Sequence, residues 1–575
     1  MVKLTIDGKA VSVPEGTKIL DAAKEIGVNI PTMCYLKEIN EISACRVCAV
    51  EVTGSEKLVP ACSTPVAEGM EVFTHSARVL QARVTNISLI LSQHNATCAA
   101  CARCGNCALQ SLASDINYQP PFDTTPAEMK WNRKYPLIRD ASRCIKCMRC
   151  VAVCDKVQTM HVWDVLGTGA RTTVGVRDGM DLMDVNCTLC GQCITHCPVG
   201  ALYARDDAIK VARGLGTRKE KNKVYICQVA PAVRSAWGDD VGLSQEQATV
   251  GRMVAALRAV GFDYVFDTDF SADLTIMEEG SEFIERLTHR DEYRWPMFTS
   301  CCPGWLRFIK TEYPAYIPNL STAKSPQQMF GAVAKSYFAQ KLGRDPEDIV
   351  CVSFMPCTAK KWECSVDAVN DAASRDVDTV LTTRELARML RNFRINVAAL
   401  PEEEFDDPLG ESTGAGVIFG TTGGVMEAAL RSAYYLVTGE NPDADAFHAV
   451  RGMDGVRAAT FEINGIKVRT AVANGLGNAR KLMEAIRRGE VEYDFVEIMA
   501  CPTGCAGGGG QPIRDGQELG ERRGGYLRKL DEEKPIRFSH ENPSIKTLYA
   551  EYLEKPLSHR AHKLLHTDVS QWSLK

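Results

Sequence analysis

The sequence predicts an α+β protein of about four domains, and three observations carry this prediction. The 575 residues are several times the length of a typical single domain. Sixteen of the 24 cysteines lie between Cys34 and Cys197, a density that ordinary cores do not need. Beyond about residue 210, strand-like and helix-like runs alternate, which is typical of layered α/β structure. The chain therefore divides into a cysteine-rich N-terminal half and a layered C-terminal half.

Composition and charge narrow the classes of function. Hydrophobic residues make up 45% of the chain and charged residues 24%, as expected for a protein with ordinary buried cores. The net charge of -5 gives no reason to expect a nucleic acid partner. No apolar run is long enough to span a bilayer, and the first residues lack the pattern of a cleavable export signal. We therefore expect a cytoplasmic protein whose cysteines bind metal and do not form disulfides.

Residues 1–78 are predicted to form one small β-rich domain. Residues 2–13 alternate apolar and polar side chains around an Asp-Gly turn, and residues 17–27 indicate a helix that ends at Gly27. The cysteines that follow contain one close pair, whereas zinc ribbons use two. The hairpin and helix resemble the β-grasp of plant-type ferredoxins, so a 2Fe–2S cluster is expected. Its predicted ligands are Cys34, Cys45, Cys48 and Cys62.

A second set of metal donors occupies the segment 79–125. It offers one imidazole and three thiolates, a set that also suits structural zinc. The donors are His94, Cys98, Cys101 and Cys107. The donors directly follow the first domain. This position and their spacing resemble the cluster run of the large iron–sulfur subunit of respiratory NADH dehydrogenase and of one class of hydrogenases. The resemblance implies a 4Fe–4S cluster with a histidine ligand, and Cys104 is interpreted as a spare thiol.

Residues 126–209 carry two cysteine runs of the bacterial ferredoxin type. In two-cluster ferredoxins the fourth cysteine of each run binds the other cluster. One 4Fe–4S cluster is therefore predicted on Cys144, Cys147, Cys150 and Cys197. The other is predicted on Cys187, Cys190, Cys193 and Cys154. Four clusters in a row indicate an electron path that leads into the second half of the chain.

The second half, residues 210–575, is predicted to place its chemistry on loops that leave buried strands. The basic stretch 212–223 is interpreted as a solvated linker at the start of this half. The strands expected from apolar runs include 224–230, 349–355 and 495–500. No convincing dinucleotide or flavin motif is found, so a nucleotide-binding partner would have to be another polypeptide.

Three loops of this half carry cysteines, and they span residues 299–305, 355–361 and 499–512. Together they supply five thiols, one more than a 4Fe–4S cluster needs. These thiols are Cys301, Cys302, Cys357, Cys501 and Cys505.

The three loops, in this order and at these separations, resemble the L1, L2 and L3 signatures of FeFe hydrogenases. The resemblance covers essentially the whole chain and implies a two-lobed α/β catalytic domain that holds an H-cluster. It assigns the 4Fe–4S part of this cluster to Cys302, Cys357, Cys501 and Cys505. It also implies that Cys505 bridges to a two-iron subsite carrying carbonyl, cyanide and azadithiolate. Cys301 is then not a ligand and passes a proton to the bridge amine.

A helix predicted over residues 271–287 places Glu279, Glu282 and Arg286 on one face. On these residues alone, the simplest interpretation is an exposed Glu282–Arg286 pair worth under about 1 kcal/mol. The family resemblance implies instead a proton relay from the surface to Cys301. Its members would be Arg286, Glu282, Ser321 and Glu279.

The resemblance also assigns groups around the two-iron subsite. Lys360 is expected to pair with a cyanide nitrogen and to offset its negative charge. Ala232 stands where the clostridial monomer has a serine, which removes one hydrogen bond to cyanide. The residues expected to line or contact the subsite are Ala230, Pro231, Gln327, Met355, Phe419 and Met499.

The predicted function is reversible reduction of protons to dihydrogen, with electrons from one 2Fe–2S and three accessory 4Fe–4S clusters. We favour a catalytic subunit of an NAD(P)-linked complex over a monomer served by soluble ferredoxin, and we leave open whether such a complex is electron-bifurcating. Flavin- and NAD(P)-binding subunits and dedicated H-cluster maturation proteins are the expected partners. A non-catalytic iron–sulfur assembly relative and a hydrogen sensor are the alternatives. The presence of Cys301 and the relay argues against the first, and the lack of unassigned residues argues against the second.

Overall fold

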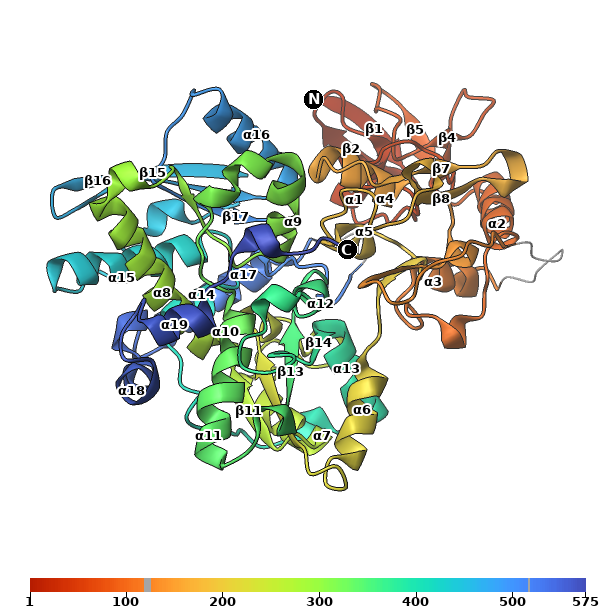
Figure 1. Ribbon diagram of the computed structural model, residues 1–575. Coiled ribbons are helices and arrows are strands. Elements are labelled where there is room, and N and C mark those ends of the chain that lie inside the picture. The colour runs from red at the N-terminus through yellow and green to blue at the C-terminus, as the bar shows by residue number, and fades with distance from the viewer. Residues whose placement is uncertain (118–125, 454, 515–517) are drawn as a thin grey trace.

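The computed structural model describes residues 1–117, 126–453, 455–514 and 518–575. The cysteine-rich half forms one side of the molecule and the two-lobed C-terminal half forms the other (Figure 1). The end of the predicted second segment, residues 118–125, lies outside the described residues.

The first domain is a five-stranded sheet with the strand order β2-β1-β5-β3-β4, and helix α1 (Ile19–Glu25) shares its core. The strands are β1 (Val2–Ile6), β2 (Lys9–Val13), β3 (Ala49–Val52), β4 (Val59–Pro60) and β5 (Glu71–Phe73). The predicted hairpin is confirmed, because β1 and β2 pair antiparallel. Asp7 and Gly8 form its turn with positive φ angles of 49° and 77°, which this residue pair tolerates.

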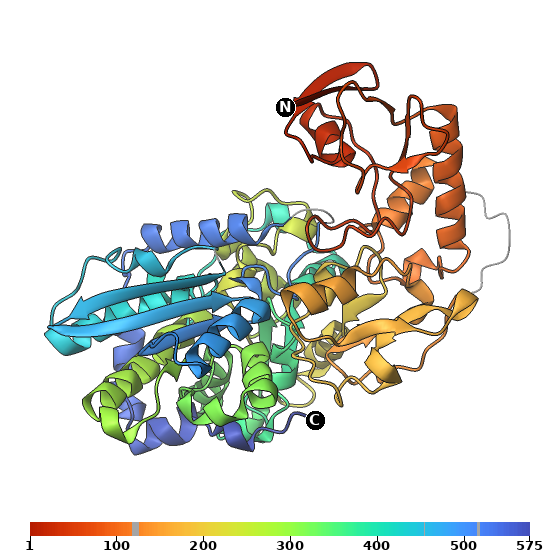
Figure 2. The same ribbon diagram turned by 90° about the horizontal axis from the view of Figure 1, so that it is seen from above.

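Helix α2 (Ala77–Leu91) leads from the first domain to the His94 segment, which ends in α3 (Ala108–Asp115). The ferredoxin-like part contains two short helices, α4 (Arg149–Ala152) and α5 (Gln192–Thr195), and an antiparallel pair, β6 (Leu137–Arg139) with β9 (Leu202–Ala204). A hairpin of β7 (Trp163–Leu166) and β8 (Thr173–Val176) separates the two cysteine runs. Figure 2 shows the first domain standing clear of the catalytic half, with the ferredoxin-like part between them.

The C-terminal half is built on two four-stranded sheets, one in each lobe. The first sheet is parallel and has the order β11-β10-β13-β14, with β10 (Val224–Val229), β11 (Tyr264–Asp267), β13 (Ile349–Met355) and β14 (Thr379–Thr382). The second sheet has the order β12-β17-β16-β15, with β12 (Met297–Phe298), β15 (Val456–Ile463), β16 (Ile466–Asn474) and β17 (Phe495–Met499). One cysteine loop follows β13 of the first sheet, and the other two follow β12 and β17 of the second sheet. The three loops therefore come from both lobes.

Helix α8 (Thr268–Thr288) is the central helix of this half, because it contacts α10 (Pro326–Val333), α14 (Gly414–Ile418) and α15 (Gly424–Thr438). The other helices include α7 (Val250–Val260), α9 (Pro303–Glu312), α12 (Lys360–Glu363), α13 (Thr383–Asn392) and α16 (Leu476–Arg487). The C-terminal segment adds α17 (Gly520–Glu533), α18 (Pro543–Leu548) and α19 (His559–Leu565).

The predicted linker over residues 212–223 is wrong in its first half. Helix α6 (Ala208–Thr217) covers this stretch and buries Ala208, Val211 and Leu215. The spacing of these three side chains puts them on one helical face. The basic residues that suggested a solvated loop occupy the other faces of an amphipathic helix.

Among the described residues, none of the helices combines the length and the apolar character that crossing a bilayer requires.

Candidate active site

The three cysteine loops meet around a buried cavity between the two lobes. The cavity measures about 80 Å³ and is walled almost entirely by apolar atoms and by the five cysteines of the loops. Protein interiors are normally close-packed, and one water needs only about 10–15 Å³. Such a void lined by five thiols is shaped to hold a group that is larger than a few waters.

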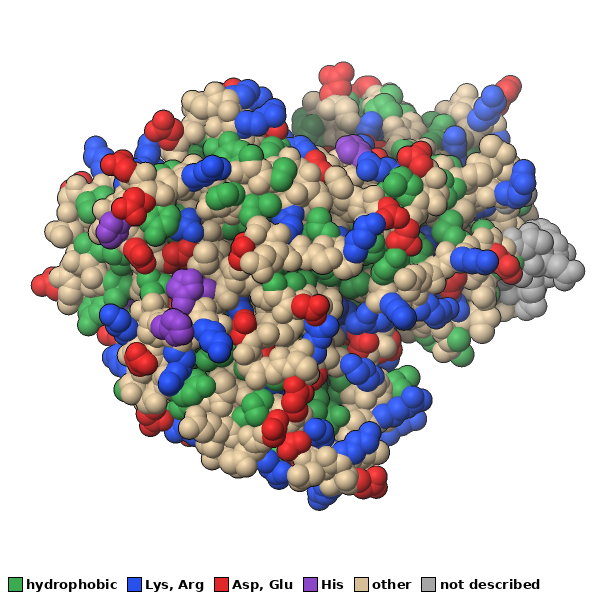
Figure 3. Space-filling model, in the orientation of Figure 1, with side chains coloured by type: hydrophobic (Ala, Val, Ile, Leu, Met, Phe, Trp, Pro, Cys, Tyr) green, Lys and Arg blue, Asp and Glu red, His purple; other side chains and the backbone are tan. Residues whose placement is uncertain are grey.

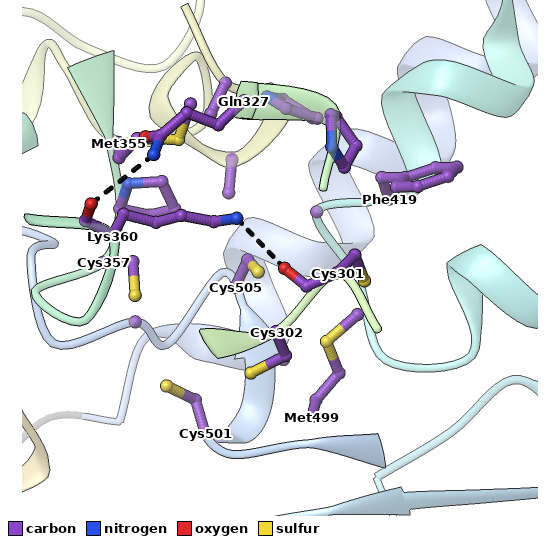
Figure 4. Close-up of a pocket in the computed structure, with 18 of the residues that line it drawn as sticks. Cys301, Cys302, Gln327, Met355, Cys357, Lys360, Phe419, Met499, Cys501 and Cys505 are labelled. Carbon is purple, nitrogen blue, oxygen red and sulfur yellow. Dashed lines mark hydrogen bonds between the residues drawn. The ribbon is translucent and has the colours of Figure 1, made fainter. Parts of the chain in front are cut away.

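Four of the five sulfurs surround one side of this space, namely those of Cys302, Cys357, Cys501 and Cys505 (Figure 4). The sulfur of Cys301 lies outside this group (Figure 4). Cys302 has an extended backbone, with φ -100° and ψ 104°, and Pro303 begins α9 directly after it. Successive side chains of extended chain point to opposite sides, so the two neighbouring thiols face different parts of the cavity.

The electrostatics of these cysteines fit a metal cluster. Burial raises the pKa of the Cys501 thiol well above its usual value, and the neighbouring sulfurs, Cys357 first, raise it further. Burial likewise raises the pKa of Cys302, Cys357 and Cys505. Four buried thiolates without a cation would be costly, whereas bound iron compensates their charge. The donor set and its surroundings thus fit a 4Fe–4S cluster.

Lys360 reaches into the cavity from the L2 loop. Its Nζ donates to Cys301 O at 3.0 Å and to both oxygens of Glu363, at 3.1 and 2.9 Å. Burial alone would lower the pKa of Lys360, but the Glu363 carboxylate more than reverses this and keeps the lysine charged. Glu363 also accepts hydrogen bonds from Gln327 Nε2 at 3.1 Å and Ser325 Oγ at 3.0 Å. Sequence reasoning missed Glu363, which fixes two predicted pocket residues at once.

The remaining predicted pocket residues all line the cavity. They are Ala230, Pro231, Met355, Phe419 and Met499. Ala232 also lines it, and its carbonyl accepts a hydrogen bond from Gln511 Nε2 at 2.8 Å.

The predicted relay residues lie in a buried row. Ser321 Oγ donates to Glu282 Oε2 at 2.9 Å, and Arg286 Nη2 donates to Glu282 Oε1 at 2.5 Å. The side chains of Arg286 and Glu282 are only 4% and 9% exposed. The exposed surface pair, which was the simplest interpretation of these residues, is therefore wrong, because both side chains are held inside the protein by residues distant in sequence.

Glu279 stands next in this row, towards Cys301. Both of its carboxylate oxygens are buried and have no hydrogen-bond partner in the described part of the chain. Burial raises its pKa to about 8, and the nearby Glu282 adds to this effect. Ser321 and the Ser300 backbone oppose the shift but do not reach hydrogen-bonding geometry. Glu279 is therefore a neutral carboxylic acid at pH 7, able to give up a proton.

Cys301 is the neighbour of Glu279 on the cavity side. Burial raises the pKa of its thiol well above the usual value, and Glu279 is the first charged neighbour to raise it further. The thiol therefore keeps its proton at neutral pH and can pass it on without becoming a stable thiolate.

The donors predicted for the two N-terminal clusters come together in the structure. Cys48 Sγ lies 3.3 Å from Cys62 Sγ, and this hydrogen bond lowers the pKa of Cys62 to about 6. His94 Nδ1 lies 3.0 Å from the Arg143 carbonyl, and burial lowers the pKa of the ring. A neutral ring that donates through Nδ1 leaves Nε2 free to bind metal. One cavity is lined by His94 together with Cys98, Cys101, Cys104 and Cys107.

The ferredoxin-like cysteines are grouped across the two runs. Burial and then the neighbouring Cys197 raise the pKa of Cys147. One cavity is lined by Cys154, Cys187, Cys190 and Cys193. Each run therefore sends its fourth cysteine to the other group. Among the described residues no three His, Cys, Asp or Glu side chains converge on a single metal ion.

Close contacts connect these groups to one another and to the catalytic cavity. Asn40 Nδ2 donates to the carbonyls of both Cys34 and Cys147, at 2.7 and 2.9 Å. Arg103 Nη1 donates to Cys197 O at 3.0 Å. At the other end, a Cβ atom on Gly509 would lie 2.4 Å from Cys190 O, so only glycine lets the L3 loop pack this closely.

The C-terminal segment covers the outer end of the relay, and sequence reasoning did not single it out. Helix α19 contacts α10, and α18 contacts α8. Side chains of the C-terminal segment contact α8, the relay helix, as the buried hydrogen bond from Tyr549 to Glu278 shows.

Comparison with known proteins identifies the family. Over 581 residues the chain is 49% identical to the NADP-reducing hydrogenase subunit HndD of Solidesulfovibrio fructosivorans, covering 99% of this chain and 98% of the relative. The chain belongs to the FeFe hydrogenase family. It is also 38% identical to iron hydrogenase 1 of Clostridium pasteurianum, over 98% of this chain and 99% of that one. The solved structure of apo FeFe hydrogenase HydA1 from Chlamydomonas reinhardtii is 45% identical, with a TM-score of 0.56 over 63% of this chain and 98% of that chain.

Family models match successive parts of this FeFe hydrogenase. Residues 1–77 match a 2Fe-2S iron-sulfur cluster binding domain, and 83–120 match the NADH-ubiquinone oxidoreductase-G iron-sulfur binding region. Residues 143–201 match a 4Fe-4S dicluster domain. Residues 223–509 match the iron only hydrogenase large subunit, C-terminal domain, and 517–570 match the iron hydrogenase small subunit.

These matches confirm the predicted fold class, the enzyme class and the set of clusters. They decide the His94 segment in favour of an iron–sulfur cluster over structural zinc. The predicted domain limits and the roles of individual residues stay predictions.

Proposed function

We propose that this FeFe hydrogenase is the hydrogen-activating subunit of an NADP-linked complex. The support is its 49% identity, over nearly the whole of both chains, to a relative described as an NADP-reducing hydrogenase subunit. The chain itself shows no convincing dinucleotide or flavin motif, so the nucleotide would be bound by partner subunits. A monomer served by soluble ferredoxin is the second candidate, supported by 38% identity to iron hydrogenase 1 of Clostridium pasteurianum.

The observation that carries the catalytic proposal is the division of the five thiols in the cavity. Cys302, Cys357, Cys501 and Cys505 would hold the 4Fe–4S part of the H-cluster, and Cys301 stands apart on the side of Glu279. When bound, the H-cluster supplies the metal at which two protons and two electrons combine to dihydrogen. Lys360, held by Glu363, would place a positive charge beside the cyanide-bearing subsite.

Protons would travel along α8 in a fixed order. Glu282 would receive a proton at the outer end, where Arg286 and Ser321 hold its carboxylate. Glu279 would carry the proton inward as a neutral acid and give it to the Cys301 sulfur, which hands on its own proton. Glu279 and Ser321 are each only 1% exposed, so bulk water has little access to the inner part of this row.

Electrons would enter through the clusters of the N-terminal half and leave it near Cys190, which packs on the L3 loop. The 2Fe–2S and His94 groups both contact the Cys147 and Cys197 group, so either can pass electrons to it. Assembly of the two-iron subsite would need the dedicated maturation proteins. A cytoplasmic location agrees with 24 free cysteines, which a reducing compartment preserves.

The test is co-purification of the tagged chain from cells that express its maturation proteins. We expect flavoprotein subunits in the purified complex and dihydrogen release driven by NADPH, alone or, if the complex is electron-bifurcating, together with reduced ferredoxin, with reduced methyl viologen as a control for the hydrogenase itself. Viologen-driven activity without any NADPH-driven activity, and with full activity from reduced ferredoxin, would favour the monomer.

A further inference from the structure

Helix α8 also carries Glu278, a buried carboxylate that the proposed relay does not use. In the described part of the chain it accepts three hydrogen bonds. The Tyr549 hydroxyl donates to Oε1 at 2.5 Å, the Leu557 N–H donates to Oε2 at 3.0 Å, and His566 Nε2 lies 3.0 Å from Oε2. All three partners belong to residues 549–566. Every hydrogen bond that the Glu278 side chain accepts from the described residues therefore comes from the C-terminal segment.

The second nitrogen of His566 reaches the relay. Its Nδ1 lies 2.8 Å from Thr322 Oγ1, and the ring is 5% exposed. The backbone N–H of the same Thr322 donates to both oxygens of Glu282, at 3.2 and 3.1 Å. Thr567 N donates to Thr322 O at 2.8 Å, which fixes the two backbones side by side. A continuous set of hydrogen bonds thus runs from Glu278 through His566 and Thr322 to the outer carboxylate of the relay.

We propose that His566 is a positioning residue of the proton relay, which sets the placement and the protonation of Glu282 through Thr322. The C-terminal segment is then part of the proton pathway and not only a cover for α8. This inference rests on the proposed relay role of Glu282.

The chemistry of the ring explains how it would act. The Glu278 oxygen is an acceptor, so we assign the His566 proton to Nε2, where it donates to Glu278. Nδ1 then accepts a hydrogen bond from the Thr322 hydroxyl. When His566 takes up a proton on Nδ1, it must donate to Thr322 Oγ1, and the hydroxyl hydrogen has to turn away from the ring. Each protonation of His566 therefore rearranges the residue that anchors Glu282 and brings a positive charge near that carboxylate.

His566 has a route to solvent through the last turn of α19, the helix that it caps. The ring of His562 stacks on it, with ring centroids 4.4 Å apart, and His562 is exposed. Figure 3 shows histidine side chains at the surface over α19. Imidazole is the side chain that exchanges protons most readily near neutral pH. The charged neighbours of His562 include Glu282, Glu278 and Glu285. Two of these carboxylates have buried partners of their own, because Tyr549 bonds Glu278 and Arg286 bonds Glu282.

The experiment compares His566→Gln with His559→Gln in the complete, matured enzyme. Glutamine can keep both hydrogen bonds of His566 but cannot take up a proton. His559 is the first residue of α19, the helix that His566 caps at its C-terminal end, and it is exposed, so its replacement is a matched control. We expect His566→Gln to lose at least about ten-fold in turnover and to change its pH profile, while His559→Gln does neither. The infrared bands of the H-cluster and the thermal midpoint should be unchanged in both.

A pair of variants at Thr322 tests the connection itself. Thr322→Ser keeps the hydroxyl and should retain the turnover and pH profile, whereas Thr322→Val keeps the backbone anchor but should repeat the His566→Gln defect. Wild-type turnover and pH profile in His566→Gln would overturn the proposal. A lower thermal midpoint with an unchanged pH profile would also overturn it, since that result means a structural role only.

The outcome for the proposed function is read separately. Glu282→Gln should remove most of the turnover if the relay runs through this carboxylate. If Glu282→Gln is inactive and His566→Gln is normal, the relay stands and the role of the C-terminal segment fails. If Glu282→Gln is fully active, the relay itself is refuted.

Discussion

Replacing Glu279 by glutamine should make the protein more stable at alkaline pH while it removes turnover. The carboxyl group is buried without a hydrogen-bond partner among the described residues, and its pKa is raised to about 8 from 4.5. In the unfolded chain the same group ionises near its ordinary value. Glutamine has almost the same shape and cannot ionise, so it removes the cost of the buried charge and also the proton that the relay carries.

The magnitude follows from the difference between the two pKa values. The rise of the Glu279 pKa from 4.5 to about 8 corresponds to about 5 kcal/mol. Because the folded pKa is the higher one, the protonated form favours folding. The penalty is absent below pH 4.5, grows between pH 4.5 and 8, and is constant above pH 8. Glu279→Gln should therefore gain up to about 5 kcal/mol at pH 8 or above and almost nothing at pH 4.5.

The assay is thermal unfolding of the matured enzyme under anaerobic conditions at pH 5 and pH 8, with Glu285→Gln as the control. Glu285 lies on the same helix but is exposed. We expect the midpoint of Glu279→Gln to exceed that of the wild type by several degrees at pH 8 and by much less at pH 5. An equal difference at both pH values, or no difference at all, would refute the reasoning about the buried charge.

The same pKa predicts the pH dependence of turnover. Release of dihydrogen needs Glu279 in its protonated form, so its rate should fall as pH rises through about 8. Oxidation of dihydrogen needs the ionised form and should rise over the same range. Glu279→Gln should be nearly inactive in both directions. Substantial turnover by this variant would show that protons reach the cavity by another way.

Three further predictions concern the cavity and the electron path. Cys301→Ser should keep every cluster signal in electron paramagnetic resonance but lose at least about 100-fold in turnover, since a hydroxyl is a poorer proton donor than a thiol at this site. Glu363→Gln should weaken the hold on Lys360 and shift the cyanide infrared bands, with turnover reduced but not lost. Cys197→Ser should change one accessory 4Fe–4S signal and leave the H-cluster bands in place, and loss of both accessory 4Fe–4S signals would contradict the grouping.

The sequence could predict the clusters because most cluster ligands follow a fixed local spacing. The run from Cys144 to Cys154 has meaning within eleven residues, and the three catalytic loops are recognisable one at a time. The contacts that make those residues work are not local. Glu363 lies three residues from Lys360, but its second partner, Gln327, is 36 residues away in the sequence.

Burial was the property that sequence reasoning judged least well. The pair Glu282–Arg286 has the spacing of a common surface salt bridge, and only the packing of residues 319–322 on α8 makes it internal. The basic stretch 212–223 was misjudged for the opposite reason, because exposed charges concealed the buried stripe of α6. In both cases the spacing was visible, but the surroundings that decide its meaning come from residues far along the chain.

The doublet of Cys301 and Cys302 shows how a local rule can organise the whole site. The residue before a proline is restricted to extended backbone, so Pro303 forces Cys302 into the conformation that the structure shows. In extended chain the two neighbouring thiols must point to opposite sides. One side faces the cluster ligands and the electron path, and the other faces Glu279 and the proton path. The electron path and the proton path can thus end at one buried cavity without crossing, because Pro303 fixes the backbone that separates Cys302 from Cys301.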